Sequence, residues 1–357
     1  MCLNELLYNL IRIAIGNSKA LTRQLTDDEW ESLYMVCEKQ AVLGIAFVGI
    51  QKLPKEQMPP IDLFEKWSEK AQRAKDRNEL YNRRCKEICD TFDSNGYESC
   101  IVKGQSNIVY YPEELKDYRA ARELDIISWP IGQKAGKRDI MEYVNFLYIS
   151  SSRHLKPKVV YHHVEWDTAT IPVDIRIEPS YFNCPWHDRR FQKWLNENIS
   201  ASKIELGIPI ASTYFNVVYL LVHLYRRMFC EGISMDFLLD LYFILVRLNK
   251  ESVNKEELMK VLSHFGMRRF TTGIMYVLRT VFDMADEYLL CSPNERAGKF
   301  VLTMTMQRGY AIESERHKRF KRLSTIKRIF TWTRRNWRFL PQYPLEVFFD
   351  LYKRMVV

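Results

Sequence analysis

Three carboxylates stand in two short runs whose residue types are typical of β-strands. The run ELDIISW places Glu123 and Asp125 two residues apart, so both side chains point from the same face of one strand. The run IPVDIRIE supplies Asp174 from a strand that we expect to be its neighbour. Acidic side chains that converge at the edge of a sheet repel one another unless a cation lies between them, and such oxygen ligands suit Mg²⁺. The pattern fits phosphoryl transfer with two Mg²⁺ ions, which steady the attacking and leaving oxygens.

A turn that fits phosphate binding ends another β-prone run, SCIVKG. In the sequence KGQS, Gly104 permits close approach of the backbone to a phosphate, Ser106 offers a hydroxyl group and Lys103 offers a positive charge. The segment that follows is expected to begin a helix whose N-terminal amides face the phosphates. The structural alternative is that the acidic pair on ELDIISW only makes the outer face of a strand soluble.

The elements that must position these residues follow a helix, sheet, helix order. Residues 1–94 have helical periodicity, with Thr26 as the expected N-cap of one helix. Residues 95–205 hold four β-prone runs, SCIVKG, ELDIISW, VVYHHVEW and IPVDIRIE, separated by helical material. Helical patterns return over 206–300, and 301–357 form a basic amphipathic tail. We therefore predict an α+β protein whose small mixed β-sheet core is flanked by N-terminal and C-terminal helical regions.

Composition predicts a globular protein of the cell interior. The chain has 357 residues, of which 47% are hydrophobic, so it can bury a sizeable core.

The sequence predicts no membrane-spanning helix. Its longest apolar stretch, residues 214–225, is interrupted by Asn216 and His223 and is shorter than the ~18 to 20 residues of a membrane span. The N-terminal segment lacks the cleavage site of a signal peptide, and a cytoplasmic location is expected. The eight cysteines lack the CxxC spacing of a zinc site, so we expect reduced thiols.

The net charge of +9 is concentrated in the C-terminal tail. Residues 313–357 hold twelve Lys or Arg against four Asp or Glu, which leaves the rest of the chain nearly neutral. Nucleic acid is therefore expected to bind only through the tail, if it binds at all. Apolar side chains recur there at helical spacing, which fits either a helix that binds RNA or a membrane surface, or a helix packed on the core. These side chains are Phe320, Leu323, Ile326, Phe330 and Trp337.

The order of these motifs resembles a known family. The run IVKGQSNIVYYPEELKDYRAARELDIISW is similar to the signature of the uncharacterised bacterial nucleotidyltransferase family of the polymerase-beta-like superfamily, in which a Lys-Gly turn precedes an Arg, three residues and a DxD strand. The resemblance covers about residues 26–285, and IPVDIRI looks like the family's third-carboxylate strand. The segment LVHLYRRMFCEGISMDFLLDLYFIL looks like a helical His-to-Asp segment of the family. The matching positions are Lys103, Gly104, Arg119, Glu123, Asp125, Asp174, His223 and Asp240.

The resemblance implies a reaction and a set of ligands. Glu123 and Asp125 would hold Mg²⁺ with a nucleoside triphosphate, and Asp174 would hold a second Mg²⁺ and help to activate an acceptor hydroxyl. The acceptor would be a small molecule, a glycan or a protein, and the products would be a nucleotidylated acceptor and pyrophosphate. Lys103, Gly104 and Ser106 would form the phosphate-binding turn.

Three further positions have two interpretations each. Arg119 either contacts the triphosphate or is a solvated loop charge. His223 and Asp240 lie in an apolar helical context, so they either form a buried hydrogen-bonding pair or contact the substrate.

Two positions depart from the family pattern. The first metal-binding Asp of the family is Glu123 here, which is one methylene longer, and the Gly that usually precedes it is Arg122. A guanidinium at this place would pair either with the carboxylates, which would weaken catalysis, or with substrate phosphate. The departures favour an alternative function, a catalytically inactive protein that keeps the fold and binds a nucleotide, a glycan or a partner protein.

Overall fold

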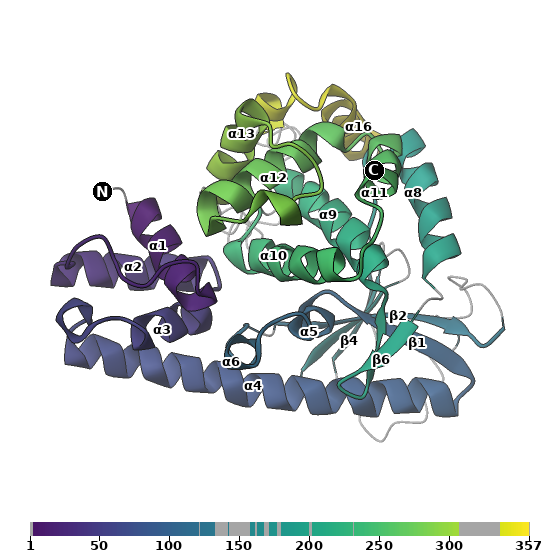
Figure 1. Ribbon diagram of the computed structural model, residues 1–357. Helices are drawn as coiled ribbons and strands as arrows, with labels where there is room; N and C mark the ends of the chain where they lie inside the picture. Colours follow the sequence, from purple (N-terminus) through teal and green to yellow (C-terminus); the bar gives the residue numbers. More distant parts are fainter. Residues whose placement is uncertain are drawn as a thin grey trace.

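A computed structural model gives the fold of the chain, in which helices cover both faces of a mixed sheet (Figure 1). Helices come first in the chain, strands follow, and helices return after the last strand. This order confirms the predicted α+β class with a mixed sheet between helical regions. The structure describes residues 3–120, 122–132, 142, 158–160, 163–167, 171–176, 180–199, 202–230, 232–306 and 336–356.

The N-terminal part of the chain is helical, as predicted. Its helices are α1 (Leu3–Ile15), α2 (Asp27–Lys39), α3 (Leu43–Gln51) and α4 (Ile61–Ser94). The expected cap at Thr26 is confirmed, because the Glu29 amide donates to the Thr26 hydroxyl and the Thr26 amide donates to the Glu29 carboxylate. This reciprocal arrangement satisfies two amides that the helix itself leaves without partners, and it sets where α2 begins.

Helix α4 joins the N-terminal helices to the sheet, and Figure 1 shows it running beneath both. Near its start, the buried Trp67 indole donates to the Leu43 carbonyl of α3 at 2.9 Å. Near its end, Ile88 and Phe92 pack in a second apolar cluster together with residues of the strands. One long helix therefore fixes the helical region relative to the sheet.

The sheet has seven described strands in the order β3-β4-β5-β2-β1-β7-β6. The pairs β1–β7 and β2–β5 are parallel, and the other neighbours are antiparallel. The strands are β1 (Tyr97–Val102), β2 (Leu124–Pro130), β3 (Lys158–Val160), β4 (His163–Asp167), β5 (Pro172–Arg176), β6 (Ser202–Glu205) and β7 (Ile208–Ala211).

Two hairpins differ from the predicted strands. The run VVYHHVEW was expected to form one strand, which is wrong: it folds back on itself, with Val160 opposite His163, and forms β3 and β4. The hairpin β6–β7 was not predicted. Its turn consists of Leu206 and Gly207, both with positive φ, as tight two-residue hairpin turns require. The sheet therefore continues past residue 205, which was the expected end of the α/β core.

The two faces of the sheet belong to different apolar clusters. Along β1 and β2, Cys100 and Ile127 pack in the cluster that contains α9, whereas Ile101 and Ile126 pack in the cluster that contains α4. This alternation follows from the two-residue period of a strand. The helices after α4 are α5 (Gly104–Ile108), α6 (Glu113–Lys116), α8 (Pro185–Asn198), α9 (Thr213–Cys230), α10 (Met235–Lys250), α11 (Lys255–His264), α12 (Arg268–Phe282), α13 (Glu295–Met306) and α16 (Pro344–Val356).

The basic tail was predicted to carry an apolar stripe, and most of that stripe falls at residues 307–335, which lie outside the described residues. Its last member, Trp337, is described and has an exposed side chain. In the described part of the chain, no helix combines the length and the hydropathy needed to cross a membrane. The seven cysteines in that part are free thiols, as expected.

Candidate active site

The structure brings Glu123, Asp125 and Asp174 together. Strand β2 pairs in parallel with β5, and Asp125 lies directly opposite Asp174 in the register. Asp125 shares its strand face with Ile127, so the carboxylates lie on the face that α9 covers. Glu123 immediately precedes β2, and one carboxylate oxygen from each of the three residues lies within 4.8 Å of the other two. Asp125 and Asp174 are buried, whereas the Glu123 side chain is about half exposed.

Two buried cations lie against these carboxylates. The Lys103 ammonium is 2.8 Å from Asp125 Oδ1, and Arg176 Nη2 is 2.7 Å from Asp174 Oδ2. Arg176 also contacts Asp125 closely and lies 3.6 Å from Glu123. Three carboxylates with two cations leave one negative charge uncompensated within this set. Sequence reasoning missed Arg176, although its place two residues after Asp174 puts it on the same strand face.

Repulsion between the carboxylates shifts the pKa values of Asp174 and Glu123. Burial and the negative charge of Asp125 raise the pKa of Asp174 to about 6, against the opposing influence of Arg176. The charge of Asp125, followed by burial, also raises the pKa of Glu123 above its usual value. Burial opposes the charged form of Asp125, but the charges of Arg176 and Lys103 outweigh it and lower the pKa of that carboxyl. A divalent cation would lower the free energy of the charged forms of Asp174 and Glu123, so these oxygen ligands fit one.

The predicted phosphate-binding turn follows β1 directly and lies next to the carboxylates. Lys103 and Gly104 both have positive φ, at 56° and 36°, so the chain turns sharply as it enters α5. A Cβ atom at Gly104 would lie 3.6 Å from the Glu123 carbonyl, so it is the backbone conformation, and not lack of space, that favours glycine. Ser106 is fully buried, and its hydroxyl donates to the Lys103 carbonyl at 2.8 Å. The Ser106 hydroxyl therefore stabilises the turn itself.

Arg119 lies in a buried ion pair. Its Nε and Nη2 atoms donate to the two carboxylate oxygens of Asp240 on α10, each at 2.7 Å. Asn107 and Tyr111 donate to the same carboxylate at 2.9 and 2.8 Å. The interpretation of Arg119 as a solvated loop charge is wrong, because the residue is only 3% exposed. Arg119 connects the segment before β2 to the helical layer above it.

The expected pair between His223 and Asp240 does not form, because the Asp240 carboxylate bonds to other residues. His223 is buried on α9, and neither of its ring nitrogens has a hydrogen-bond partner in the described part of the chain. Burial, and after it the positive charges of Lys103 and Arg227, hold the pKa of His223 well below its usual value. A neutral imidazole therefore lies near the cations of the carboxylate site.

Arg122, which replaces the family's usual glycine, does not pair with the carboxylates of the site. Its Nη2 atom lies 3.1 Å from Asp236 Oδ2 on α10, and about a third of its side chain is exposed. The arginine that contacts the carboxylates is Arg176 and not Arg122.

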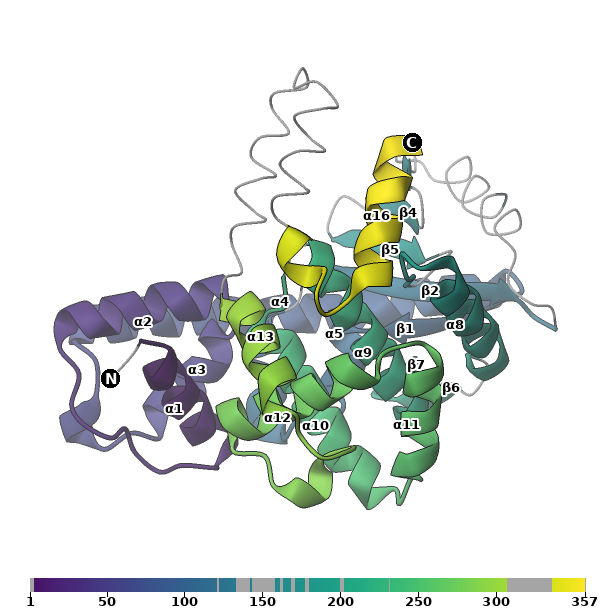
Figure 2. The ribbon, with the colours of Figure 1, turned by 90° about the horizontal axis from the view of Figure 1, so that it is seen from above.

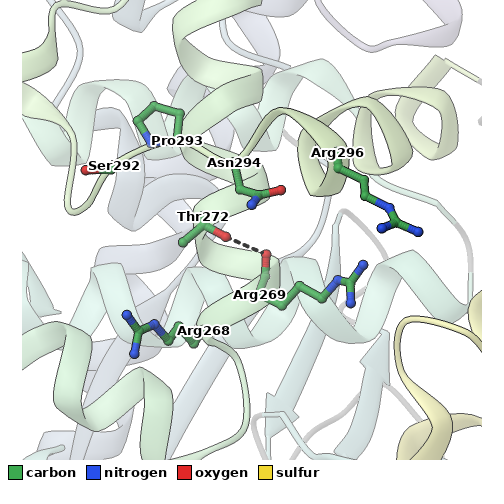
Figure 3. Close-up of a pocket in the computed structure, with 7 residues that line it drawn as sticks. All are labelled: Arg268, Arg269, Thr272, Ser292, Pro293, Asn294 and Arg296. Atoms are coloured by element: carbon green, nitrogen blue, oxygen red, sulfur yellow. Dashed lines mark hydrogen bonds between the residues drawn. The ribbon is translucent and has the colours of Figure 1, made fainter.

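A separate pocket of about 700 Å³ lies between α12 and α13 (Figure 3). In this view Arg269 and Arg296 extend to the same side of the pocket, while Arg268 extends away from them. The pocket therefore has a basic rim, but none of the predicted site residues lines it. Its lining residues are Arg268, Arg269, Thr272, Ser292, Pro293, Asn294 and Arg296.

Comparison with known proteins identifies the family. The model of a family described as uncharacterised nucleotidyltransferase matches residues 26–283, a range that includes all three carboxylates and the turn at Lys103. No curated protein and no solved structure matches the chain. The match confirms the resemblance carried by the sequence motifs and covers most of the chain. The chain therefore belongs to this family of uncharacterised nucleotidyltransferases.

Proposed function

We propose that the protein transfers a nucleoside monophosphate from a nucleoside triphosphate to a hydroxyl group and releases pyrophosphate. The observation that carries the proposal is the parallel pairing of β2 with β5, which sets Asp125 opposite Asp174 on the face covered by α9. Glu123, Asp125 and Asp174 would hold two Mg²⁺ ions. When bound, Mg²⁺ supplies positive charge to the phosphates and to the attacking oxygen.

The carboxylates also provide a proton acceptor. In the proposed reaction the acceptor oxygen forms a bond to the α-phosphorus, and the bond from that phosphorus to the bridging oxygen of pyrophosphate breaks. Asp174 would accept the hydroxyl proton, because its carboxylate lies opposite Asp125 beside the place where the acceptor oxygen would attack. The acceptor is a hydroxyl-bearing small molecule, glycan or protein.

Helix α9 provides the groups that would face the triphosphate. His223 brings two ring nitrogens that have no hydrogen-bond partner among the described residues, and Arg226 and Arg227 follow within the next turn of the helix. The Arg227 guanidinium lies over the Phe237 ring at 4.8 Å, and Arg226 lies over the Tyr181 ring at 4.7 Å. Aromatic faces hold both guanidiniums, whose positive charges act on His223 together with those of Lys103 and Arg176. We therefore place the phosphates between α9 and the turn at Lys103.

Arg176 would change partners during the reaction. Arg176 lies between Asp125 and Asp174, where it competes with Mg²⁺, so binding of the metal and nucleotide would move its guanidinium onto a phosphate.

The substitution Arg176→Gln tests this exchange. In the absence of nucleotide, the variant is expected to bind Mg²⁺ at least about tenfold more tightly, because a competing cation is removed. The same variant is expected to slow transfer about 100-fold, because a donor to the phosphates is lost. Calorimetry with Mg²⁺ and a transfer assay measure the two effects.

The matched control is Arg73→Gln. Arg73 is an exposed residue of α4 that pairs with Glu69 and not with the carboxylates of the site. This substitution should change neither quantity. If Arg176→Gln also leaves both unchanged, Arg176 does not exchange between carboxylate and phosphate.

The runner-up function is a nucleotidyltransferase fold that binds a nucleotide, a glycan or a partner protein without catalysis. The observation that favours it is the pairing of Lys103 and Arg176 with the carboxylates, which would block Mg²⁺ if Arg176 stayed in place.

Because nucleoside triphosphates are metabolites of the cell interior, we place either function in the cytoplasm. Contact with nucleic acid would be limited to the basic tail, residues 301–357.

Incubation with nucleoside triphosphates that carry a label at the α-phosphate, together with Mg²⁺ and a cell extract, tests the transfer. The label is expected to become covalently attached to an acceptor, and chelation of the metal is expected to abolish the attachment. Label that stays in free nucleotide, in the presence of tight nucleotide binding, would favour the runner-up.

A further inference from the structure

A second group of metal-ligating side chains lies where α8 meets α16, away from the carboxylate site. Cys184 and His187 stand at the start of α8, and Glu346 stands in the first turn of α16. The Cys184 sulfur, a ring nitrogen of His187 and a carboxylate oxygen of Glu346 lie within 4.8 Å of one another. Figure 2 shows α16 near α8, and the Trp186 and Phe349 rings pack edge to face at 5.3 Å between these helices.

The Glu346 carboxylate is buried, and its two oxygens differ in their hydrogen bonds: one is well bonded and the other is not. Its side chain is 3% exposed, and Oε2 accepts a hydrogen bond of 2.8 Å from the Asn183 amide. Among the described residues, Oε1 has two polar contacts, both long, at 3.4 Å to the Cys184 backbone amide and 3.3 Å to His187 Nδ1. Within the described ranges, no lysine or arginine forms an ion pair with Glu346. Burial of a carboxylate without a cation is unfavourable, so a cation bound at Oε1 would stabilise this group.

The His187 ring is held in place against this oxygen. Gly266, with a φ of 74°, lies so close that a Cβ atom there would come within 2.4 Å of His187 Cε1. Phe182 packs edge to face on the ring at 6.0 Å. These contacts fix the imidazole ring with Nδ1 toward Glu346. The His187 side chain is 17% exposed, so one side of the cluster of Cys184, His187 and Glu346 is open to water.

We propose that Cys184, His187 and Glu346 form a zinc site that fastens α16 to α8. A thiolate, an imidazole and a carboxylate are the ligand types of protein-bound Zn²⁺, whereas Mg²⁺ requires oxygen ligands such as those of the carboxylate site. The thiol proton of Cys184 would be released to solvent when the metal binds. These three ligands would leave a fourth position for water, on the open side of His187. The proposal does not depend on the proposed transferase activity.

Zinc analysis of the full-length protein tests the site. We expect about one zinc ion per purified chain, with a zinc–sulfur distance of about 2.3 Å by X-ray absorption. Replacement of zinc by Co²⁺ in the unaltered protein should give a thiolate-to-cobalt charge-transfer band in the near ultraviolet. Because this band needs no variant, a misfolded variant cannot obscure the result.

Variants then assign the ligands. Cys184→Ser and His187→Ala are expected to lower the zinc content at least about tenfold and to remove the cobalt band, with helical content checked by circular dichroism. Two matched controls, Cys291→Ser and His264→Ala, should keep both signals, and so should Asp174→Asn, which alters only the carboxylate site. A chain without bound zinc, a cobalt band that survives Cys184→Ser, or zinc lost in Asp174→Asn would overturn the proposal.

Discussion

Asp174→Asn is expected to lower nucleotide transfer by more than about 100-fold, because substitution of groups that merely support a metal ligand already costs about 10- to 100-fold. The change removes a proposed metal ligand and the proposed proton acceptor while preserving the shape of the side chain. It should spare the fold, since Glu123 and Asp125 would then balance the two cations Lys103 and Arg176. Initial rates of label transfer, with folding checked by circular dichroism, measure the effect.

The control for this prediction is Asp93→Asn, an exposed position on α4. Its rate should equal that of the unaltered protein. A rate that stayed within a few-fold of normal in Asp174→Asn would show that the carboxylate opposite Asp125 has no part in the chemistry.

Asp240→Ala is expected to lower the free energy of unfolding by about 3–5 kcal/mol, because it leaves the Arg119 guanidinium buried without a counter-charge. The carboxylate also accepts hydrogen bonds from Asn107 and Tyr111, and these two donors lose their partner as well. Denaturant unfolding of the variant and the unaltered protein gives the difference.

Asp286→Ala is the matched control for this prediction. It breaks the pair of Asp286 with Arg279, in which the Asp286 side chain is 77% exposed, so the change in stability should be small. Equal effects in the two variants would mean that the Arg119–Asp240 pair contributes no more than a surface ion pair.

The features of the fold that local sequence determines were predicted well. The two-residue period of a strand predicted that Glu123 and Asp125 share one face, and their carboxylates do lie within 4.8 Å of each other, although β2 itself begins at Leu124. The cap at Thr26 needs only Glu29, three residues later, to complete it. Asp174 was recognised as the third carboxylate from its strand-like run, and the register of β2 with β5 sets it opposite Asp125.

The features that depend on packing between distant segments were not predictable in the same way. Arg119 and Asp240 are 121 residues apart, and only the docking of α10 onto the segment before β2 brings them together. His223 was expected to pair with Asp240 because both lie in apolar helices, but the helices turn them toward different neighbours.

The β6–β7 hairpin and the cluster of Cys184, His187 and Glu346 were not predicted either, because the sequence around them carries few local signals. The turn between the short strands β6 and β7 consists of Leu206 and Gly207, and because leucine rarely adopts positive φ, Gly207 was its single turn signal. Glu346 lies 159 residues after His187 in the chain, so sequence spacing gave no sign that it could share a site with Cys184 and His187.

Calorimetric titration with ATP, GTP, CTP and UTP, with and without Mg²⁺, tests most directly whether Glu123, Asp125 and Asp174 bind a metal and nucleotide together. We predict saturable binding of at least one nucleotide that requires Mg²⁺ and is lost in Asp125→Asn. Binding of the same strength without Mg²⁺, or in Asp125→Asn, would contradict the account, and so would the absence of binding by all four nucleotides.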